Sequence, residues 1–431
     1  MKKYRLFVVA LVVVLALAGC QKVDSPVTMK PNETRPTETE PVVVRDWMAG
    51  ESPVPNNRIG VKRWGMIDSE AAVSPTGVYY LYQIMFVINQ TPPSPMILYA
   101  DHGSDTFIKL CGRPDCTHNT TDCNAYVDGG EHLSYHGGAL YVISAGYEDG
   151  TMTQKCKLLR MAPDGTGRTE VYDFGKFAKE KGCAYAECDM ITEGYCLFRT
   201  YNYVADSNGG TTADEQGKYY YKLDGSMAEP EELDANGWVL YNCGDVILTY
   251  HPAAENGGQH GSYWDWDPAT DTLTYLTDHP GEAGWFGKTE GYYFKDGSVR
   301  RLTYATGEEQ IVIQTDLEGN YYAYCFPDCI MLVSNEIRST SDKNLYFYNW
   351  DFQPIVTATM EYSGSSLLSS AVLGETADKI LLTESHIYPV PTHYTSKAEL
   401  GTEKVQVHEF DLTAIEEMLQ TVKKFYPDAP W

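Results

Sequence analysis

Apolar strands alternate with short polar turns along most of this chain, and the alternation repeats. At seven places a turn with Gly or Asp precedes a strand rich in Tyr, Ile, Val and Leu. These places begin at Gly77, Gly138, Gly194, Gly244, Gly291, Asp328 and Asp378. Successive starts are 61, 56, 50, 47, 37 and 50 residues apart. A repeat near fifty residues is typical of propellers and solenoids.

Each repeat contains three further strands. A short apolar stretch precedes most of the starts, as at 237–241 and 321–324, and a strand, a polar turn and another strand follow. These turns lie at 101–105, 163–167, 223–226, 267–271, 304–308, 349–352 and 410–412. Asp, Pro and Gly suit tight turns, and four-stranded units repeated radially form propellers. We therefore predict an all-β fold, a seven-bladed β-propeller; six blades, eight blades or two β-sandwiches are the alternatives.

Helical periodicity is confined to the end of the chain. There Ile415, Met418, Leu419 and Val422 have the i, i+3, i+4, i+7 spacing of one helix face. Thr413 and Glu416 fit a capping box. The pattern predicts a short C-terminal helix over 414–425.

The first residues have the pattern of an export signal. Three basic residues precede an apolar run that ends near Ala16, and Leu-Ala-Gly-Cys20 follows. This predicts a signal peptide over 1–19, because the run is too short to span a membrane. The last four residues resemble the lipobox of bacterial lipoproteins. That resemblance implies a lipid on Cys20 and a location on the extracellular side of the cell membrane; an ordinary secretory signal is the alternative.

Residues 20–45 differ in composition from the rest of the chain. This segment is rich in Pro, Thr and Glu and poor in apolar residues, so it cannot bury enough surface to order itself. We interpret it as a disordered tether that follows the lipidated cysteine. Residues 46–431 then form the propeller domain.

The charge balance excludes some partners. The chain has 33 Lys and Arg against 59 Asp and Glu, a formal net charge of −26, and loss of the signal peptide removes three more positive charges. Nucleic acids and anionic membrane surfaces need basic patches. We therefore expect no nucleic-acid partner, and a monomer that contacts the membrane through its N-terminal lipid.

The densest chemical signal is a group of four residues within a thirteen-residue insert, 111–123. Cys111, Cys116, His118 and Cys123 could bind zinc as a closed structural site. Alternatively, cysteines of the insert form a disulfide, as is common outside the cytoplasm. Besides Cys20 the chain has ten cysteines, an even number. We favour disulfides here, with structural zinc as the alternative; the sequence requires no cofactor.

Other cysteines are also close enough along the chain to pair. The local pairs are Cys183 with Cys188, Cys188 with Cys196, and Cys325 with Cys329.

Two resemblances follow from these patterns. The rhythm of hydrophobic strand, Asp-Gly turn and strand over about 60–412 resembles TolB-like bacterial propellers. The motif Cys-x4-Cys-x-His-x4-Cys-Asn-Ala, together with the lipobox, resembles surface lipoproteins of Gram-positive gut anaerobes. The second resemblance implies a surface location, and it does not indicate any particular activity.

A ligand site is most plausible in the loops after the second strands. We expect these loops at 89–95, 147–155, 200–218, 251–262, 335–343 and 384–400, all on one face of the propeller. Aromatic rings can stack on sugars or anchor a protein. The candidate ligand-binding residues are Tyr201, Tyr203, His251, His260, Tyr263, Trp264, His386, Tyr388, His393 and Tyr394. The alternative is that a chain with 33 tyrosines carries them on every surface.

No catalytic motif stands out. The sequence lacks Gly-x-Ser-x-Gly, His-Glu-x-x-His, a phosphate-binding Gly-rich loop and a complete EF-hand loop. We therefore favour a binding module for a glycan or an envelope protein. The alternative is an enzyme for carbohydrate or peptide with carboxylates in the propeller channel. A third hypothesis, a transporter's substrate-binding lipoprotein, would need an α/β fold.

Overall fold

The computed structural model of this chain describes the larger part of the predicted propeller domain. The described residues are 50–51, 53, 71–82, 95–147, 154–192, 194–205, 210–233, 238–242, 246–251, 261–278, 284–334, 343–360, 371–383, 392–402 and 405–416. The chain divides into two compact units, Met1–Val43 and Val44–Trp431, and every described residue belongs to the second. The predicted signal peptide, Cys20 and the tether therefore lie outside the described residues.

Seven four-stranded antiparallel sheets make up the described domain, and each uses four strands that are consecutive in the sequence. Blades 1 to 3 contain β1 (Ala71–Val73), β2 (Gly77–Tyr82), β3 (Met96–Asp101), β4 (Ile108–Lys109); β5 (Gly130–His136), β6 (Ala139–Tyr147), β7 (Gln154–Met161), β8 (Thr169–Asp173); β9 (Tyr185–Thr192), β10 (Tyr195–Ala205), β11 (Thr211–Lys222) and β12 (Glu231–Glu232). Blades 4 and 5 contain β13 (Trp238–Asn242), β14 (Ile247–His251), β15 (Ser262–Asp267), β16 (Thr272–Thr277); β17 (Trp285–Phe286), β18 (Glu290–Lys295), β19 (Ser298–Thr303) and β20 (Glu308–Gln314). Blades 6 and 7 contain β21 (Tyr321–Cys325), β22 (Ile330–Ser334), β23 (Lys343–Tyr348), β24 (Pro354–Met360); β25 (Ala371–Glu375), β26 (Lys379–Thr383), β27 (His393–Ser396) and β28 (Val407–Glu409).

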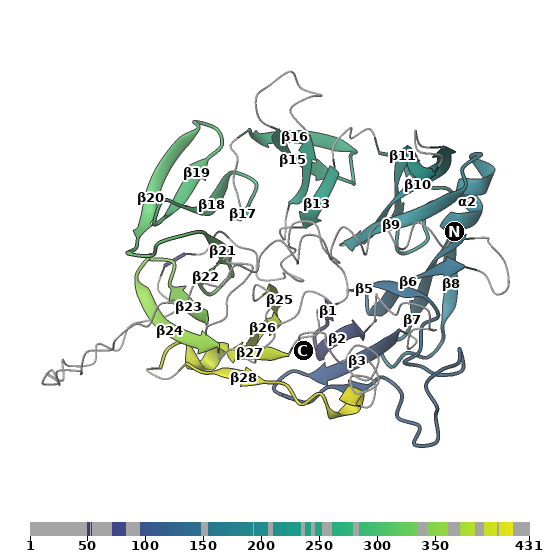
Figure 1. The fold of residues 1–431 in the computed structure, drawn as a ribbon, viewed down its shortest axis with the longest axis horizontal. Helices are drawn as coiled ribbons and strands as arrows, with labels where there is room; N and C mark the ends of the chain where they lie inside the picture. The colour runs from purple at the N-terminus through teal and green to yellow at the C-terminus, as the bar shows by residue number, and fades with distance from the viewer. Residues whose placement is uncertain are drawn as a thin grey trace, which may run out of the picture. The chain divides into compact units, whose positions relative to one another are not determined.

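This arrangement is a seven-bladed β-propeller, which confirms the predicted fold. Figure 1 shows the seven sheets following one another in chain order. Six of the seven repeat starts lie within two residues of the beginning of a blade's second strand: Gly77, Gly138, Gly194, Gly291, Asp328 and Asp378. Gly244 lies outside the described residues.

Two of the starts lie in turns whose backbone conformation favours glycine. Gly138 has a φ of 80° and Gly194 a φ of 82°, and only glycine adopts this region without steric cost. The turns predicted between third and fourth strands also fit blades 1 to 6. In blade 7 the prediction is wrong, because β28 already ends before 410–412.

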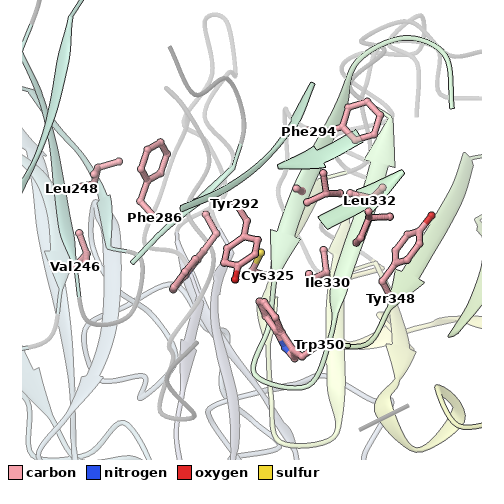
Figure 2. Close-up of a cluster of buried hydrophobic side chains, with 14 of the residues drawn as sticks. Val246, Leu248, Phe286, Tyr292, Phe294, Cys325, Ile330, Leu332, Tyr348 and Trp350 are labelled. Atoms are coloured by element: carbon pink, nitrogen blue, oxygen red, sulfur yellow. The ribbon is translucent and has the colours of Figure 1, made fainter. Parts of the chain in front are cut away.

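Packed side chains fill the interfaces between neighbouring blades. Separate buried clusters join blades 1 and 2, 2 and 3, 3 and 4, 6 and 7, and 7 and 1. One further cluster joins blades 4, 5 and 6, and Figure 2 shows Leu248, Phe286 and Leu332 of these blades within it. Because one cluster joins the last blade to the first, the circle of blades is closed. Each large apolar side chain buried there stabilises the fold by roughly 1.5–3 kcal/mol.

The helical prediction needs one correction. The sequence analysis missed α2 (Phe174–Glu180), which follows β8 and buries Phe174, Phe177 and Ala178. The segment of the predicted helix 414–425 begins with a 3₁₀ turn, η2 (Thr413–Ile415), and residues 417–425 lie outside the described residues. A second 3₁₀ turn, η1 (Lys397–Glu399), follows β27. No helix among the described residues is long and apolar enough to cross a membrane.

The predicted loop 200–218 is mostly strand. In the structure β10 and β11 pair from Tyr195 to Ala205, so this hairpin is the longest in the described chain. The polar residues of the segment lie on the exposed faces of paired strands, where polar side chains are tolerated.

Candidate metal centre

The cysteine-rich insert leaves blade 1 after β4. The chain then contacts β3 of blade 1 again at Ala125 and Tyr126 before it enters β5 of blade 2. Both ends of the insert bond to Ile97 of β3. The backbone N–H of Leu110 donates to the Ile97 carbonyl at 3.0 Å, and the Ile97 N–H donates to the carbonyl of Ala125 at 2.8 Å. Tyr126 also pairs with Met96. The insert is therefore a loop with a fixed base rather than a free excursion.

The loop brings the four predicted ligands together. One ligand atom from each of Cys111, Cys116, His118 and Cys123 lies within 4.8 Å of the other three. The Nδ1 atom of His118 is 3.3 Å from Sγ of Cys123. Cys111 and Cys123 are buried, and the other two residues are half-buried. Three sulfurs and one imidazole nitrogen therefore lie close enough together to be the ligands of one metal ion.

Local turns hold this arrangement. The N–H of Cys123 donates to the Thr120 carbonyl at 3.0 Å. Arg113 crosses the loop, where its guanidinium donates to Sγ of Cys116 at 3.3 Å and to the Asp122 carbonyl at 2.6 Å. His118 itself has a φ of 54°, an uncommon conformation for a non-glycine residue. Such strain often marks functional sites.

The electrostatics differ among the ligands. Burial raises the pKa of Cys111, but hydrogen bonds from Arg113 outweigh it and bring this pKa down to about 7. Burial raises the pKa of Cys123 to about 11. Burial, then the charges of Lys109 and Arg113, lower the pKa of His118. The imidazole is therefore neutral at physiological pH, which is the form that binds metal.

The favoured disulfides are absent from the described residues. No disulfide joins any two of the nine cysteines described there: Cys111, Cys116, Cys123, Cys156, Cys183, Cys188, Cys196, Cys325 and Cys329. The nearest approach to a predicted pair is Cys188 with Cys196, whose sulfurs are 3.5 Å apart. In the insert the three sulfurs gather around His118 instead of pairing, and this geometry suits a metal better than a disulfide, which would use two of them.

Among the predicted ligand-binding residues, Tyr201 and Tyr203 form a stack on blade 3. The ring of Tyr185 on β9 lies 5.1 Å from that of Tyr201 and 5.2 Å from that of Tyr203. Tyr201 is buried, whereas Tyr203 is 54% exposed. The Tyr203 hydroxyl donates to Oε1 of Gln154 on blade 2 at 3.3 Å. The stack is thus fixed at its base and open at Tyr203.

The candidate residues on blade 4 lie on both faces of its sheet. The rings of His251 and Trp264 are 5.5 Å apart, and the indole N–H of Trp264 donates to Oγ of Ser262 at 2.8 Å. Tyr263 points the other way, because neighbouring residues of a strand face opposite sides. It is 4% exposed and stacks on Phe286 of blade 5. Its ring therefore serves packing.

The residues on blade 7 are held by their neighbours. Nδ1 of His393 is 2.8 Å from the Thr392 hydroxyl. Tyr394 stacks on His408 at 5.0 Å and packs against Phe410 at 4.7 Å. The predicted aromatic residues thus lie in separate groups on blades 3, 4 and 7. His260, His386 and Tyr388 lie outside the described residues.

Charged residues of blades 2 and 3 escaped the sequence analysis. The Arg199 guanidinium donates to both carboxylate oxygens of Asp189 at 2.7 and 2.8 Å and lies 5.4 Å from the Tyr201 ring. Burial and the charge of Glu187 raise the pKa of Glu131 to about 7. The one available signal was the i, i+2 spacing of Glu187 and Asp189, which places both on one face of a strand.

Comparison with known proteins assigns no family to this chain. No protein-family model and no curated protein sequence matches this chain. Among solved structures it is similar to an oligogalacturonate lyase in complex with manganese, with 12% identity over 64% of this chain and 75% of the other, at a TM-score of 0.39. It is also similar to TolB from Acinetobacter baumannii, with 12% identity over 65% and 62% of the two chains, at a TM-score of 0.31. The β-propeller domain of the Trilobed protease from Pyrococcus furiosus, described as having an open velcro topology, shares 11% identity over 70% and 99%, at a TM-score of 0.36.

Proposed function

We propose that this protein is a monomeric, lipid-anchored propeller outside the cytoplasm, and that it is a binding module for a neutral glycan. The Leu-Ala-Gly-Cys20 segment after a basic and apolar start supports the anchor. The observation that carries the binding function is the tyrosine stack on blade 3. We also propose that the insert, 111–123, binds a zinc ion with a structural role.

The stack has the properties of a sugar platform. Tyr203 presents an exposed ring, and its contacts with Tyr185 and Gln154 fix that ring before a ligand arrives. A preordered ring loses little entropy on binding. Sugar rings stack on aromatic faces, and their hydroxyl groups need nearby polar partners. Arg199 and Asp189, beside Tyr201, offer such partners.

The charge of the chain favours a neutral ligand. With a formal net charge of −26, the protein repels polyanions such as acidic polysaccharides. A neutral polysaccharide avoids this repulsion, and an envelope protein with a basic surface is the competing ligand.

A glycan array probed with soluble protein from residue 46 onward tests this function. We expect saturable binding to neutral glycans, and at least a tenfold loss of affinity on Tyr203→Ala. The matched control is Tyr275→Ala, which removes a similarly exposed tyrosine, 49% exposed, from blade 4. An equal loss in both variants, or binding to proteins alone, would contradict the proposal.

The insert supports a structural zinc site. Ideal tetrahedral zinc has Zn–S distances of about 2.3 Å and ligands about 3.5–3.8 Å from one another, and the four ligand atoms here lie within 4.8 Å. The donor set of three sulfurs and one imidazole is complete, so zinc would have no open position for a substrate. Its role would be to hold the loop.

Metal analysis of the purified protein tests the zinc site. We expect one zinc per chain, and loss of that zinc in Cys123→Ser. Cys183→Ser is the control, because it removes a half-buried thiol outside the cluster. Protein that binds no zinc after incubation with the metal, or that holds it equally in Cys123→Ser, would exclude the site.

A second candidate function is catalysis, and Glu131 is the observation in its favour. A carboxyl group with a pKa near 7 can act as a general acid at neutral pH. Glu131 and Glu187 lie on β5 and β9, the first strands of adjacent blades. Cleavage of a glycan that the array identifies, abolished by Glu131→Gln with binding retained, would establish this function.

A further inference from the structure

The circle of blades closes without exchange of strands. Blade 1 consists of β1–β4 and blade 7 of β25–β28, so in the described residues neither blade borrows a strand from the other end of the chain. Main-chain pairing between the two blades is limited in the described residues to a parallel bridge between Thr106 and Asp411. The Asp411 N–H donates to the Asp105 carbonyl at 2.7 Å, and the Phe107 N–H donates to the Asp411 carbonyl at 3.1 Å.

Side chains supply the rest of this seam, which we define as the contact of blades 1 and 7. Phe107 packs on Phe410 with ring centroids 5.0 Å apart. Asp378 accepts from the N–H of Gly103 at 2.8 Å and lies 3.8 Å from His102. One bridge and a few polar and aromatic contacts join blades 1 and 7 less firmly than a shared strand would.

The metal ligands belong to the core of the seam. Cys111 and Cys123 are buried in the same cluster as Phe107 of blade 1 and Leu381 and Phe410 of blade 7. Cys116 packs against that cluster. Any change that orders or releases these cysteines therefore acts on the seam core itself.

The insert also reaches blade 2. The Arg168 guanidinium, on the turn between β7 and β8, donates to the carbonyls of Cys123 and Asn124 at 3.4 and 3.1 Å. The side-chain amide of Asn124 donates in return to the Asp164 carbonyl at 3.1 Å. One loop thus contacts two blades directly and shares a core with a third.

Regular secondary structure does not order the insert. Residues 111–123 contain no strand or helix, and most of their side chains are exposed. Ordering such a loop costs roughly 1–2 kcal/mol per residue. A metal with four ligands offsets that cost, because binding free energy becomes folding free energy.

We propose that zinc held by Cys111, Cys116, His118 and Cys123 is a closure clasp that keeps blade 1 packed against blade 7. Loss of the metal loosens this seam first and leaves the interfaces that the insert does not contact intact. The inference rests on the proposed zinc site and adds a place in the ring where the metal acts.

Hydrogen exchange of the full chain tests the clasp. The reporters are the N–H groups of Phe107 and Asp411, which bond across the seam, and the control is the N–H of Phe326, which bonds to Cys329 within blade 6. When a chelator removes zinc, we expect exchange at least tenfold faster at the reporters and unchanged at the control. Equal acceleration at all three, or none, would overturn the clasp while the zinc site stands.

Two variants separate the metal from the fold. We expect His118→Ala to lose zinc and to show fast exchange at the seam. His118→Cys keeps four ligands, so it should retain zinc and restore slow exchange. Slow exchange in a zinc-free His118→Ala protein would overturn the clasp. Failure of the wild-type chain to bind zinc would overturn both the site and the clasp.

Discussion

Lys397 shows how much one buried charge depends on its partners. It is 6% exposed, and its ammonium lies 2.6 Å from the carboxylates of both Glu375 and Asp328. Burial lowers its pKa, but these two carboxylates outweigh burial and raise it. We expect Lys397→Met to cost about 3–5 kcal/mol, because it leaves a buried carboxylate without its lysine. Urea unfolding measures this loss.

An exposed ion pair provides the comparison. Lys176 and Glu180 are 3.7 Å apart on α2, with side chains 73% and 62% exposed, and such pairs contribute about 0.3–0.5 kcal/mol. Lys176→Met should therefore leave the unfolding midpoint almost unchanged. The double variant Lys397→Met with Glu375→Leu should recover much of the stability, since it removes the two buried charges and leaves the Asp328 carboxylate, whose side chain is 31% exposed. A loss for Lys397→Met no larger than for Lys176→Met would contradict the argument.

At the scale of elements, the stability of α2 depends on its N-cap residue, Asp173. The Asp173 carboxylate accepts from the N–H of Lys176 at 2.8 Å and caps a helix of only seven residues. We expect Asp173→Ala to cost about 1 kcal/mol, whereas Asp173→Asn keeps the cap and costs less. Denaturant unfolding of both variants measures the difference. Equal losses would assign the effect to the charge, which Lys157 also contacts at 3.6 Å.

The elements that could be predicted from sequence are those with local signals. Strands after a Gly or Asp turn repeat seven times, so their number and order were readable. The seven-residue helix carries one i, i+3, i+4 triplet, Phe174, Phe177 and Ala178, too little periodicity to distinguish it from a strand end. The four candidate metal ligands, in contrast, could be identified from the sequence because all four lie within thirteen residues.

At the scale of the whole molecule, contacts between blades were beyond the sequence. No local sequence pattern shows that Cys123 shares a hydrophobic core with Phe410. Nor does one show that Tyr185 of β9 packs against Tyr203 of β10. These contacts depend on which blades are neighbours and on strand register, which the closed circle determines. Tyr201 and Tyr203 lie within β10 and not in a loop, and the described candidate residues lie on three separate blades.

The closed circle also couples stability to pH through Glu131. Its folded pKa of about 7 exceeds the ordinary value of 4.5, chiefly because of burial and then because of the Glu187 charge. A carboxyl with a raised folded pKa stabilises the fold fully below the unfolded pKa and loses that contribution as pH rises through 7. We therefore expect the protein to lose on the order of 2 kcal/mol between pH 5 and pH 8 from this group. Glu131→Gln should flatten that dependence, and Glu318→Gln, which changes an exposed carboxylate, should not. Unfolding free energies at the two pH values measure it, and because the net charge of −26 acts on all three proteins alike, an unchanged slope in Glu131→Gln would remove Glu131 as the cause.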